Sequence, residues 1–140
     1  MQDNLQYRQA LSKVSEDIGA CEACKLRAYG STPIPGYGLP IAKLFIIGIA
    51  PTVASEHARR PFTGDPGFRL DCWLEYAGLT RSDTYVTNAI KCVARTPQGE
   101  PLGSSFFFND SWWQSCRQWL KKEFSCVSAS IVVLLGKQTV

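Results

Sequence analysis

The chain has 140 residues, 45% of them hydrophobic, and a formal net charge of +3 at pH 7. This length supports one ordinary hydrophobic core, and the mildly basic charge permits a nucleic-acid partner without requiring one, so we expect a single domain over residues 1–140. There is neither an apolar run long enough to cross a bilayer nor a secretory leader at the start, so we expect no membrane partner and a reducing, cytoplasmic location.

Hydrophobic periodicity and breaker residues predict helices over residues 5–18, 65–77 and 110–124, and strands over residues 44–48, 84–88 and 130–135. Residues 30–40 are rich in proline and glycine, which forbids regular structure, and residues 93–109 form a long irregular connection. The alternation predicts an α/β fold with a doubly wound parallel sheet. The ligand crevice of such a sheet lies at the carboxyl ends of its strands, here residues 48–52, 87–92 and 136 onward.

The last residues, 136–140, resemble the turn after the third strand and the start of another helix. An apolar strand left at the edge of a sheet invites pairing with another chain. We therefore expect a domain with three strands present and its C-terminal part missing, and we expect the complete protein to be a monomer.

The most informative spacing is that of four of the six cysteines, namely Cys21, Cys24, Cys92 and Cys116. The C-x-x-C pair offers two thiolates that are close together. Of the single cysteines, Cys92 follows a predicted strand and Cys116 lies in a predicted helix. This arrangement indicates a metal or iron–sulfur site rather than disulfides. The other two, Cys72 and Cys126, are expected to be small buried side chains.

Other motifs accompany the cysteines: Gly48-Ile-Ala-Pro-Thr52, Arg60-Pro-Phe-Thr-Gly-Asp65, Tyr85-Val-Thr-Asn-Ala-Ile-Lys-Cys92 and Leu134-Leu-Gly136. Taken together they resemble the iron–sulfur uracil-DNA glycosylases of families 4 and 5, over nearly the whole chain. The first two motifs are similar to the family 5 (type B) patterns G-L-A-P-A and R-x-F-T-G-D, so we expect a closer tie to family 5. Asn88 departs from that pattern, in the style of family 4.

The resemblance implies that the four cysteines bind a [4Fe-4S] cluster, which in this group holds the N-terminal helix and a connecting loop near the DNA surface. Zinc is the alternative. Zinc sites of four cysteines usually use two close pairs, whereas two of these ligands are unpaired and widely separated in the sequence, which favours the cluster.

Asp65 is the catalytic residue that the resemblance implies. Breaking the N-glycosidic bond develops positive charge on the sugar, so a carboxylate near C1′ stabilises that charge and orients the attacking water. The alternative is structural, because Asp-Pro-Gly at the start of a helix is an ordinary N-cap followed by proline.

The resemblance also implies base-binding residues at the crevice. An aromatic ring stacks on the extruded base, an asparagine amide reads its Watson–Crick edge, and glycine lets the backbone approach closely. Their structural alternatives are a core phenylalanine, an Asx turn and a plain strand-to-loop turn. The implied residues are Gly48, Ile49, Ala50, Pro51, Phe62 and Asn88.

A basic loop with His57, Arg59 and Arg60 is suited to contacts with DNA phosphates, and its alternative is a solvated surface loop. The group also carries a His-Pro-Ser loop beyond the third strand whose histidine polarises the base. The 140 residues of this sequence contain no such segment, because His57 is their only histidine.

We therefore predict a glycosylase that flips uracil or a related deaminated base out of DNA and hydrolyses its N-glycosidic bond. The main alternative is an iron–sulfur protein that binds nucleic acid without catalysis. A small redox protein would use the same cysteines, but it leaves the R-P-F-T-G-D and T-N-A-I-K segments unexplained.

Overall fold

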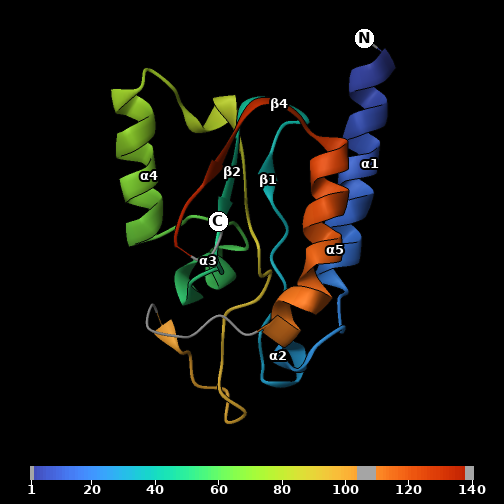
Figure 1. The fold of residues 1–140 in the computed structure, drawn as a ribbon, viewed down its shortest axis with the longest axis vertical. Coiled ribbons are helices and arrows are strands. Elements are labelled where there is room, and N and C mark those ends of the chain that lie inside the picture. The colour runs from blue at the N-terminus through green and yellow to red at the C-terminus, as the bar shows by residue number, and fades with distance from the viewer. Residues whose placement is uncertain (1, 104–109, 138–140) are drawn as a thin grey trace.

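The computed structural model describes residues 2–103 and 110–137, which form one sheet with helices on both of its faces (Figure 1). The predicted irregular connection at residues 93–109 and the predicted helix start after residue 136 lie partly outside the described residues. In chain order the elements are α1 (Gln2–Gly19), α2 (Lys25–Ala28), β1 (Tyr37–Gly38), β2 (Ile41–Gly48), α3 (Val53–Ala58), α4 (Asp65–Tyr76), the 3-10 helix η1 (Arg81–Asp83), β3 (Thr84–Asn88), α5 (Asp110–Cys126) and β4 (Ser128–Leu134).

The sheet has the strand order β1-β3-β2-β4. β2 runs parallel to both β3 and β4, which confirms the predicted α/β fold and the three predicted strands. One prediction is wrong, because β1 pairs antiparallel with β3 inside the segment expected to lack regular structure, so the sheet is mixed. A pairing of two residues leaves no hydrophobic period in the sequence, which explains why it was not predicted.

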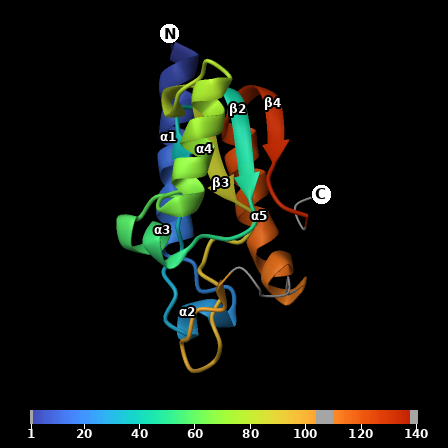
Figure 2. The same ribbon diagram turned by 90° about the vertical axis from the view of Figure 1, so that its left-hand side faces the viewer.

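Helices cover both faces of the sheet, as two perpendicular views show (Figures 1 and 2). On the face covered by α1 and α5, the buried core includes Phe45 and Tyr85 from the strands. On the face covered by α4, it includes Ile46 and Val86. Neighbouring strand residues thus point into opposite layers, which explains the uninterrupted apolar run of β2.

Three short helical segments, α2, α3 and η1, are not predicted from the sequence. α3 begins directly after the loop that follows β2, where the Thr52 hydroxyl accepts a hydrogen bond of 3.2 Å from the Ser55 backbone N–H. This N-cap turns the chain away from the sheet at the carboxyl end of β2.

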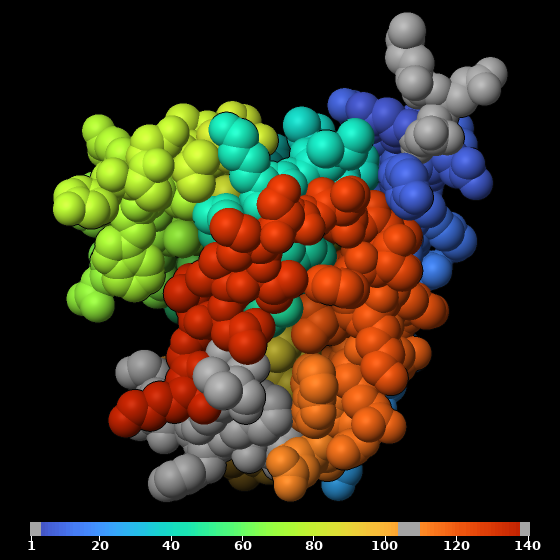
Figure 3. All heavy atoms as spheres, turned by 45° about the horizontal axis from the view of Figure 1, so that its top comes forward, coloured from blue at the N-terminus to red at the C-terminus, as the bar shows by residue number. Residues whose placement is uncertain are grey.

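β4 forms one edge of the sheet within the described residues, and it leaves Ile131, Val132 and Leu134 exposed. In the space-filling view β4 lies on the surface beside α5 (Figure 3). This is the apolar edge strand expected from the sequence. No helix in residues 2–103 and 110–137 combines the length and the apolar character needed to cross a membrane.

Candidate functional site

The carboxyl ends of β2 and β3 enclose a crevice with a cavity of about 140 Å³. Its walls come from the loop after β2, the start of α3, the loop before α4 and the end of β3, with one residue from beyond β4. The lining residues are Gly48, Ile49, Ala50, Pro51, Thr52, Ser55, Phe62, Pro66, Asn88 and Leu135. All six residues predicted to contact a base therefore line one cavity, at the place in the sheet where the crevice was expected.

Gly48 makes this arrangement possible. It lies opposite Asn88 in the parallel register of β2 and β3. A Cβ atom at Gly48 would come within 2.5 Å of Asn88 Oδ1 and 2.6 Å of Phe62 Cζ. The asparagine amide and the phenylalanine ring therefore meet over a backbone that carries no side chain, and a larger residue would fill the floor of the crevice.

Asn88 is 4% exposed, and its side-chain amide makes no hydrogen bond with the described residues. Its backbone is fixed, because the Lys91 ammonium donates to the Asn88 carbonyl at 2.6 Å and the next amide, that of Ala89, donates to the Gly48 carbonyl at 2.8 Å. A rigidly held amide that lines a cavity presents one donor pair and one acceptor to a ligand. This geometry is what reading the edge of a pyrimidine requires.

Asp65 is the first residue of α4, and Gly64, at φ 74°, is the N-cap without a side-chain hydrogen bond. The Asp65 carboxylate is exposed and makes no hydrogen bond or ion pair with the described residues, so it does not serve as the helix cap. It does not line the cavity either, although the next residue, Pro66, does. Asp65 is therefore next to the crevice lining in the sequence, in the first turn of α4, where the helix dipole favours a negative charge.

The basic loop lies outside the crevice cavity. His57, Arg59 and Arg60 are all exposed, and none of the three lines it. Arg59 ends α3 in a left-handed conformation with φ 53°. The Arg60 guanidinium lies 3.8 Å from the centre of the exposed Tyr37 ring, on the β1 side of the molecule.

Three cysteines of the predicted ligand set belong to one cluster at the end of the molecule where α2 lies beside the start of α5, two elements that Figure 1 shows. Cys92 and Cys116 are buried in one apolar cluster, and Cys24, which precedes α2, contacts that cluster. The Cys21 sulfur accepts hydrogen bonds from the Trp119 ring N–H at 3.2 Å and from the Ala23 backbone N–H at 3.5 Å. Three separate parts of the chain thus bring thiols and N–H donors together.

Burial opposes the ionisation of the Cys92 and Cys116 thiols, and a nearby cation would offset that effect. Burial raises the pKa of the Cys92 thiol, and the other three cysteines of the set add to that rise. Burial also raises the pKa of Cys116, although a hydrogen bond from the Lys91 backbone N–H opposes the effect. Thiolates here need compensating positive charge, which iron or zinc supplies. As the side chains stand, no three histidine, cysteine, aspartate or glutamate groups among the described residues are arranged to hold a single ion.

Sequence comparisons match this chain to a known family. A sequence model of the uracil DNA glycosylase superfamily matches residues 35–140, which is more than half of the chain. The chain belongs to the uracil DNA glycosylase superfamily. The match begins after Cys21 and Cys24, so it covers the crevice and two of the four cysteines.

Individual superfamily members are similar over most of this chain. A type-4 uracil-DNA glycosylase from Sulfurisphaera tokodaii is 28% identical over 134 residues, which are 93% of this chain and 56% of the relative. A type-4 enzyme from Pyrobaculum aerophilum is 30% identical over 90% of this chain and 60% of the relative. A type-5 enzyme from Thermus thermophilus is 28% identical over 87% of this chain and 58% of the relative.

The type-4 enzymes match more strongly than the type-5 enzymes, so the expected closer tie to family 5 is not supported. The family 4 style of Asn88 agrees with this result. The chain spans less than two thirds of the length of these relatives.

Sequence reasoning missed a buried ionic network between the sheet and α5, close to the crevice. Lys91 and Glu123 are 1% and 0% exposed, and the Lys91 ammonium donates to Glu123 Oε2 at 2.7 Å and to the Thr87 hydroxyl at 2.6 Å. The same carboxylate accepts hydrogen bonds from the Tyr85 hydroxyl and the Gly36 N–H. A signal was available in the sequence, because Glu123 lies on the inward-facing stripe of α5. This stripe recurs every three or four residues at the buried Trp112 and Cys116, the half-buried Trp119, and the buried Glu123 and Cys126.

The prediction for the two spare cysteines is half right. Cys126 is buried in the core under α1 and α5, as expected. Cys72 is exposed on α4, because the face of this helix that packs on the sheet carries Leu70 and Leu74 instead.

Proposed function

We propose that this chain carries the base-binding half of a uracil-DNA glycosylase, which removes uracil or a related deaminated base from DNA by hydrolysing the N-glycosidic bond. One observation carries the proposal. Three separate segments bring Gly48, Phe62 and Asn88 into contact around a small cavity, and the Asn88 amide has no partner among the described residues. A pocket for a flipped base needs a planar ring to stack on the base, an amide free to hydrogen-bond its edge, and a backbone that the base can approach closely.

Each crevice residue then has a specific task. The Phe62 ring stacks on the base, which contributes roughly 1 to 3 kcal/mol of binding free energy. The Asn88 amide hydrogen-bonds the base edge, and the backbone of residues 48–51 forms the wall. Asp65, next to the crevice lining in the sequence, supplies the negative charge that stabilises the developing sugar cation and orients water.

The cysteine site fits an iron–sulfur cluster better than it fits zinc. The other three cysteines of the set raise the pKa of the Cys92 thiol, yet the described residues form no single-ion site, and a cluster of four irons spaces its ligands more widely than one zinc ion does. When bound by Cys21, Cys24, Cys92 and Cys116, a [4Fe-4S] cluster joins distant segments of the chain. Cys92 lies four residues after Asn88, so the same segment serves both sites.

A binding protein without catalysis is the second candidate, and the lining of the crevice favours it. No ionisable side chain is among the residues that line the cavity. The crevice as described therefore recognises a base without a group that transfers a proton. Two carboxylates lie one residue from its lining in the sequence, and of these Glu56 is ion-paired with Arg95 whereas Asp65 has no such partner among the described residues.

A single-turnover assay separates the candidates. Excess protein is mixed with an oligonucleotide that contains one uracil, and alkali cleavage of the abasic product measures base release. We expect release from uracil DNA but not from thymine DNA. Asp65→Asn should retain DNA binding and lower the rate about 100-fold or more, because the amide keeps the shape but loses the charge.

Three other results are informative. Uracil-specific binding without release supports the binding protein. A full rate for Asp65→Asn removes Asp65 from the chemistry. The absence of both uracil-specific binding and base release overturns the proposal.

A further inference from the structure

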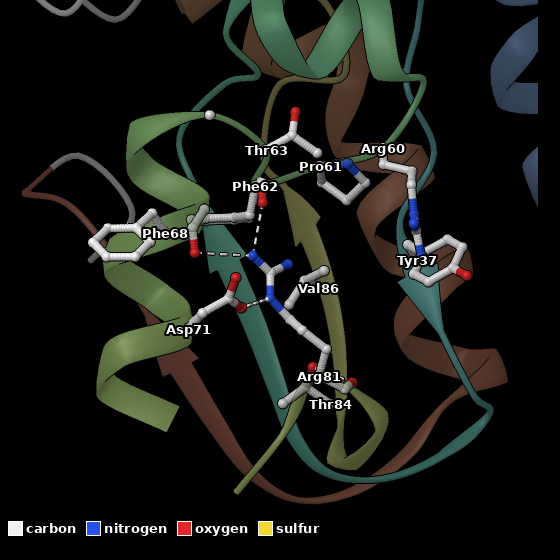
Figure 4. Close-up of a pocket in the computed structure, with 12 residues that line it drawn as sticks. Tyr37, Arg60, Pro61, Phe62, Thr63, Phe68, Asp71, Arg81, Thr84 and Val86 are labelled. Carbon is white, nitrogen blue, oxygen red and sulfur yellow. Dashed lines mark hydrogen bonds and ion pairs between the residues drawn. The ribbon is translucent and has the colours of Figure 1, made fainter. Parts of the chain in front are cut away.

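Phe62 separates two cavities. One is the crevice described above, and the other, of about 360 Å³, lies between β1 and the start of α4. Figure 4 shows this second cavity, in which the side chain of Arg81 points toward the backbone of the loop before α4. The ring that faces the crevice is therefore held from a side that no base would touch.

The backbone of Phe62 is in an unusual conformation. Its φ is 55°, in the left-handed region that bulky residues rarely adopt. A residue holds such a conformation only when its surroundings determine it. One neighbour is Gly67, where a Cβ atom would collide with the Phe62 carbonyl group. The absence of a side chain at Gly67 allows the turn, but it does not hold it.

Arg81 provides the holding contacts. Its Nη2 donates to the Phe62 carbonyl at 2.7 Å and to the Gly67 carbonyl at 3.2 Å, and its Nε donates to the Asp71 carboxylate (Figure 4). One planar guanidinium thus joins both ends of the turn to α4, which a lysine ammonium cannot reproduce with the same fork geometry.

Arg81 is itself rigidly placed. It begins η1, whose N-cap, Thr80, exchanges hydrogen bonds with Asp83 in a capping box. The Thr84 hydroxyl donates to the Arg81 carbonyl at 2.8 Å, at the first residue of β3. The arginine therefore transmits the position of β3, which carries Asn88, to the loop that carries Phe62.

We propose that Arg81 is a positioning residue for base recognition. It holds Phe62 in the left-handed conformation that sets the ring against Gly48 beside the Asn88 amide, and it does so without touching the base. This inference rests on the proposed function, because it assigns a task to the crevice. Arg81 sets the position of the Phe62 ring even when no base is bound.

The test uses the full chain labelled with 4-fluorophenylalanine and observed by fluorine NMR. The chain has seven phenylalanines, and the Phe62 signal is the one lost in Phe62→Leu. We compare Arg81→Lys with Arg69→Lys, the same change at an exposed arginine of α4 that has no hydrogen bond or ion pair with the described residues. Asp71→Asn is a second comparison, since it removes the ion pair but leaves both carbonyl contacts.

We expect the Phe62 signal to shift or broaden in Arg81→Lys but to stay in place in Arg69→Lys and Asp71→Asn. Titration with free uracil, followed by the same signal, should give a dissociation constant at least about fivefold weaker in Arg81→Lys, the low end of the stacking contribution. Thermal unfolding checks that each variant is folded. A role limited to the Arg81–Asp71 ion pair would instead make Arg81→Lys and Asp71→Asn alike.

An unmoved Phe62 signal in Arg81→Lys overturns the inference, and so does a displaced ring with unchanged uracil affinity. Failure of the proposed function gives a different result, because the unaltered chain then shows no uracil-dependent shift at all. In that case the role in base recognition falls with the function, while the spectra without uracil still decide whether Arg81 sets the ring.

Discussion

Asn88 and Lys91 lie three residues apart after the same strand, and both are almost completely buried, but their surroundings are opposite. The Asn88 amide has no hydrogen-bond partner among the described residues and lines a cavity. The Lys91 ammonium has three partners, from Thr87, Asn88 and Glu123. Buried polar groups are normally satisfied by the fold, whereas the Asn88 amide is not sealed from solvent and faces a cavity in which a ligand could become its partner.

The comparison extends to the surrounding regions. The crevice is lined by neutral residues and is open, whereas the layer under α5 holds a complete ionic network. Substitutions in the layer should therefore cost stability, and substitutions in the crevice should cost binding.

The cysteine site should give the largest effect. We expect the protein purified without oxygen to be brown and to contain iron, and we expect Cys92→Ser to lose most of the iron and of the soluble yield. Cys126→Ser is the matched control, because the two side chains are 5% and 8% exposed and only one is assigned as a ligand. Metal analysis and visible absorption measure the result. Stoichiometric zinc, or equal losses for both variants, would contradict the assignment.

The ionic layer should give the next largest effect. Glu123→Leu leaves the buried Lys91 without its counter-charge, so the free energy of unfolding should fall by about 3 to 5 kcal/mol in urea titrations. Asp17→Asn is the control, because it breaks an exposed pair with Lys13 and should cost less than about 1 kcal/mol. Similar losses for both would mean that Lys91 gains access to water.

The crevice should respond in binding rather than in stability. Gly48→Ala places a methyl group against Asn88 and Phe62, so free uracil should bind at least about tenfold more weakly. Gly19→Ala is the matched control, since a Cβ atom there meets nothing within 4 Å. Calorimetric titration gives both affinities. Unchanged uracil affinity in Gly48→Ala would place the base elsewhere.

The sequence predicts those parts of the molecule that repeat a pattern or lie where topology places them. The apolar run of β2 predicts a buried strand, and the rule for parallel sheets then predicts that Gly48 and Asn88 meet. The apolar run of β4 also predicts a buried strand, which is wrong, because β4 lies at the sheet edge with most of its side chains exposed. β1 escapes prediction because two residues carry no period. Arg81 escapes because its task depends on backbone carbonyls of Phe62 and Gly67, which no residue type reveals.

The basic loop should give the smallest effect, because exposed charges are screened by salt. If Arg59 contacts a DNA phosphate, Arg59→Ala lowers the slope of log affinity against log salt concentration by about one unit. Arg60→Ala should do less, because its guanidinium lies against the Tyr37 ring. Lys13→Ala, on α1, controls for the loss of one charge without a contact. Equal slope changes in all three variants would show that net charge alone, rather than this loop, attracts the DNA.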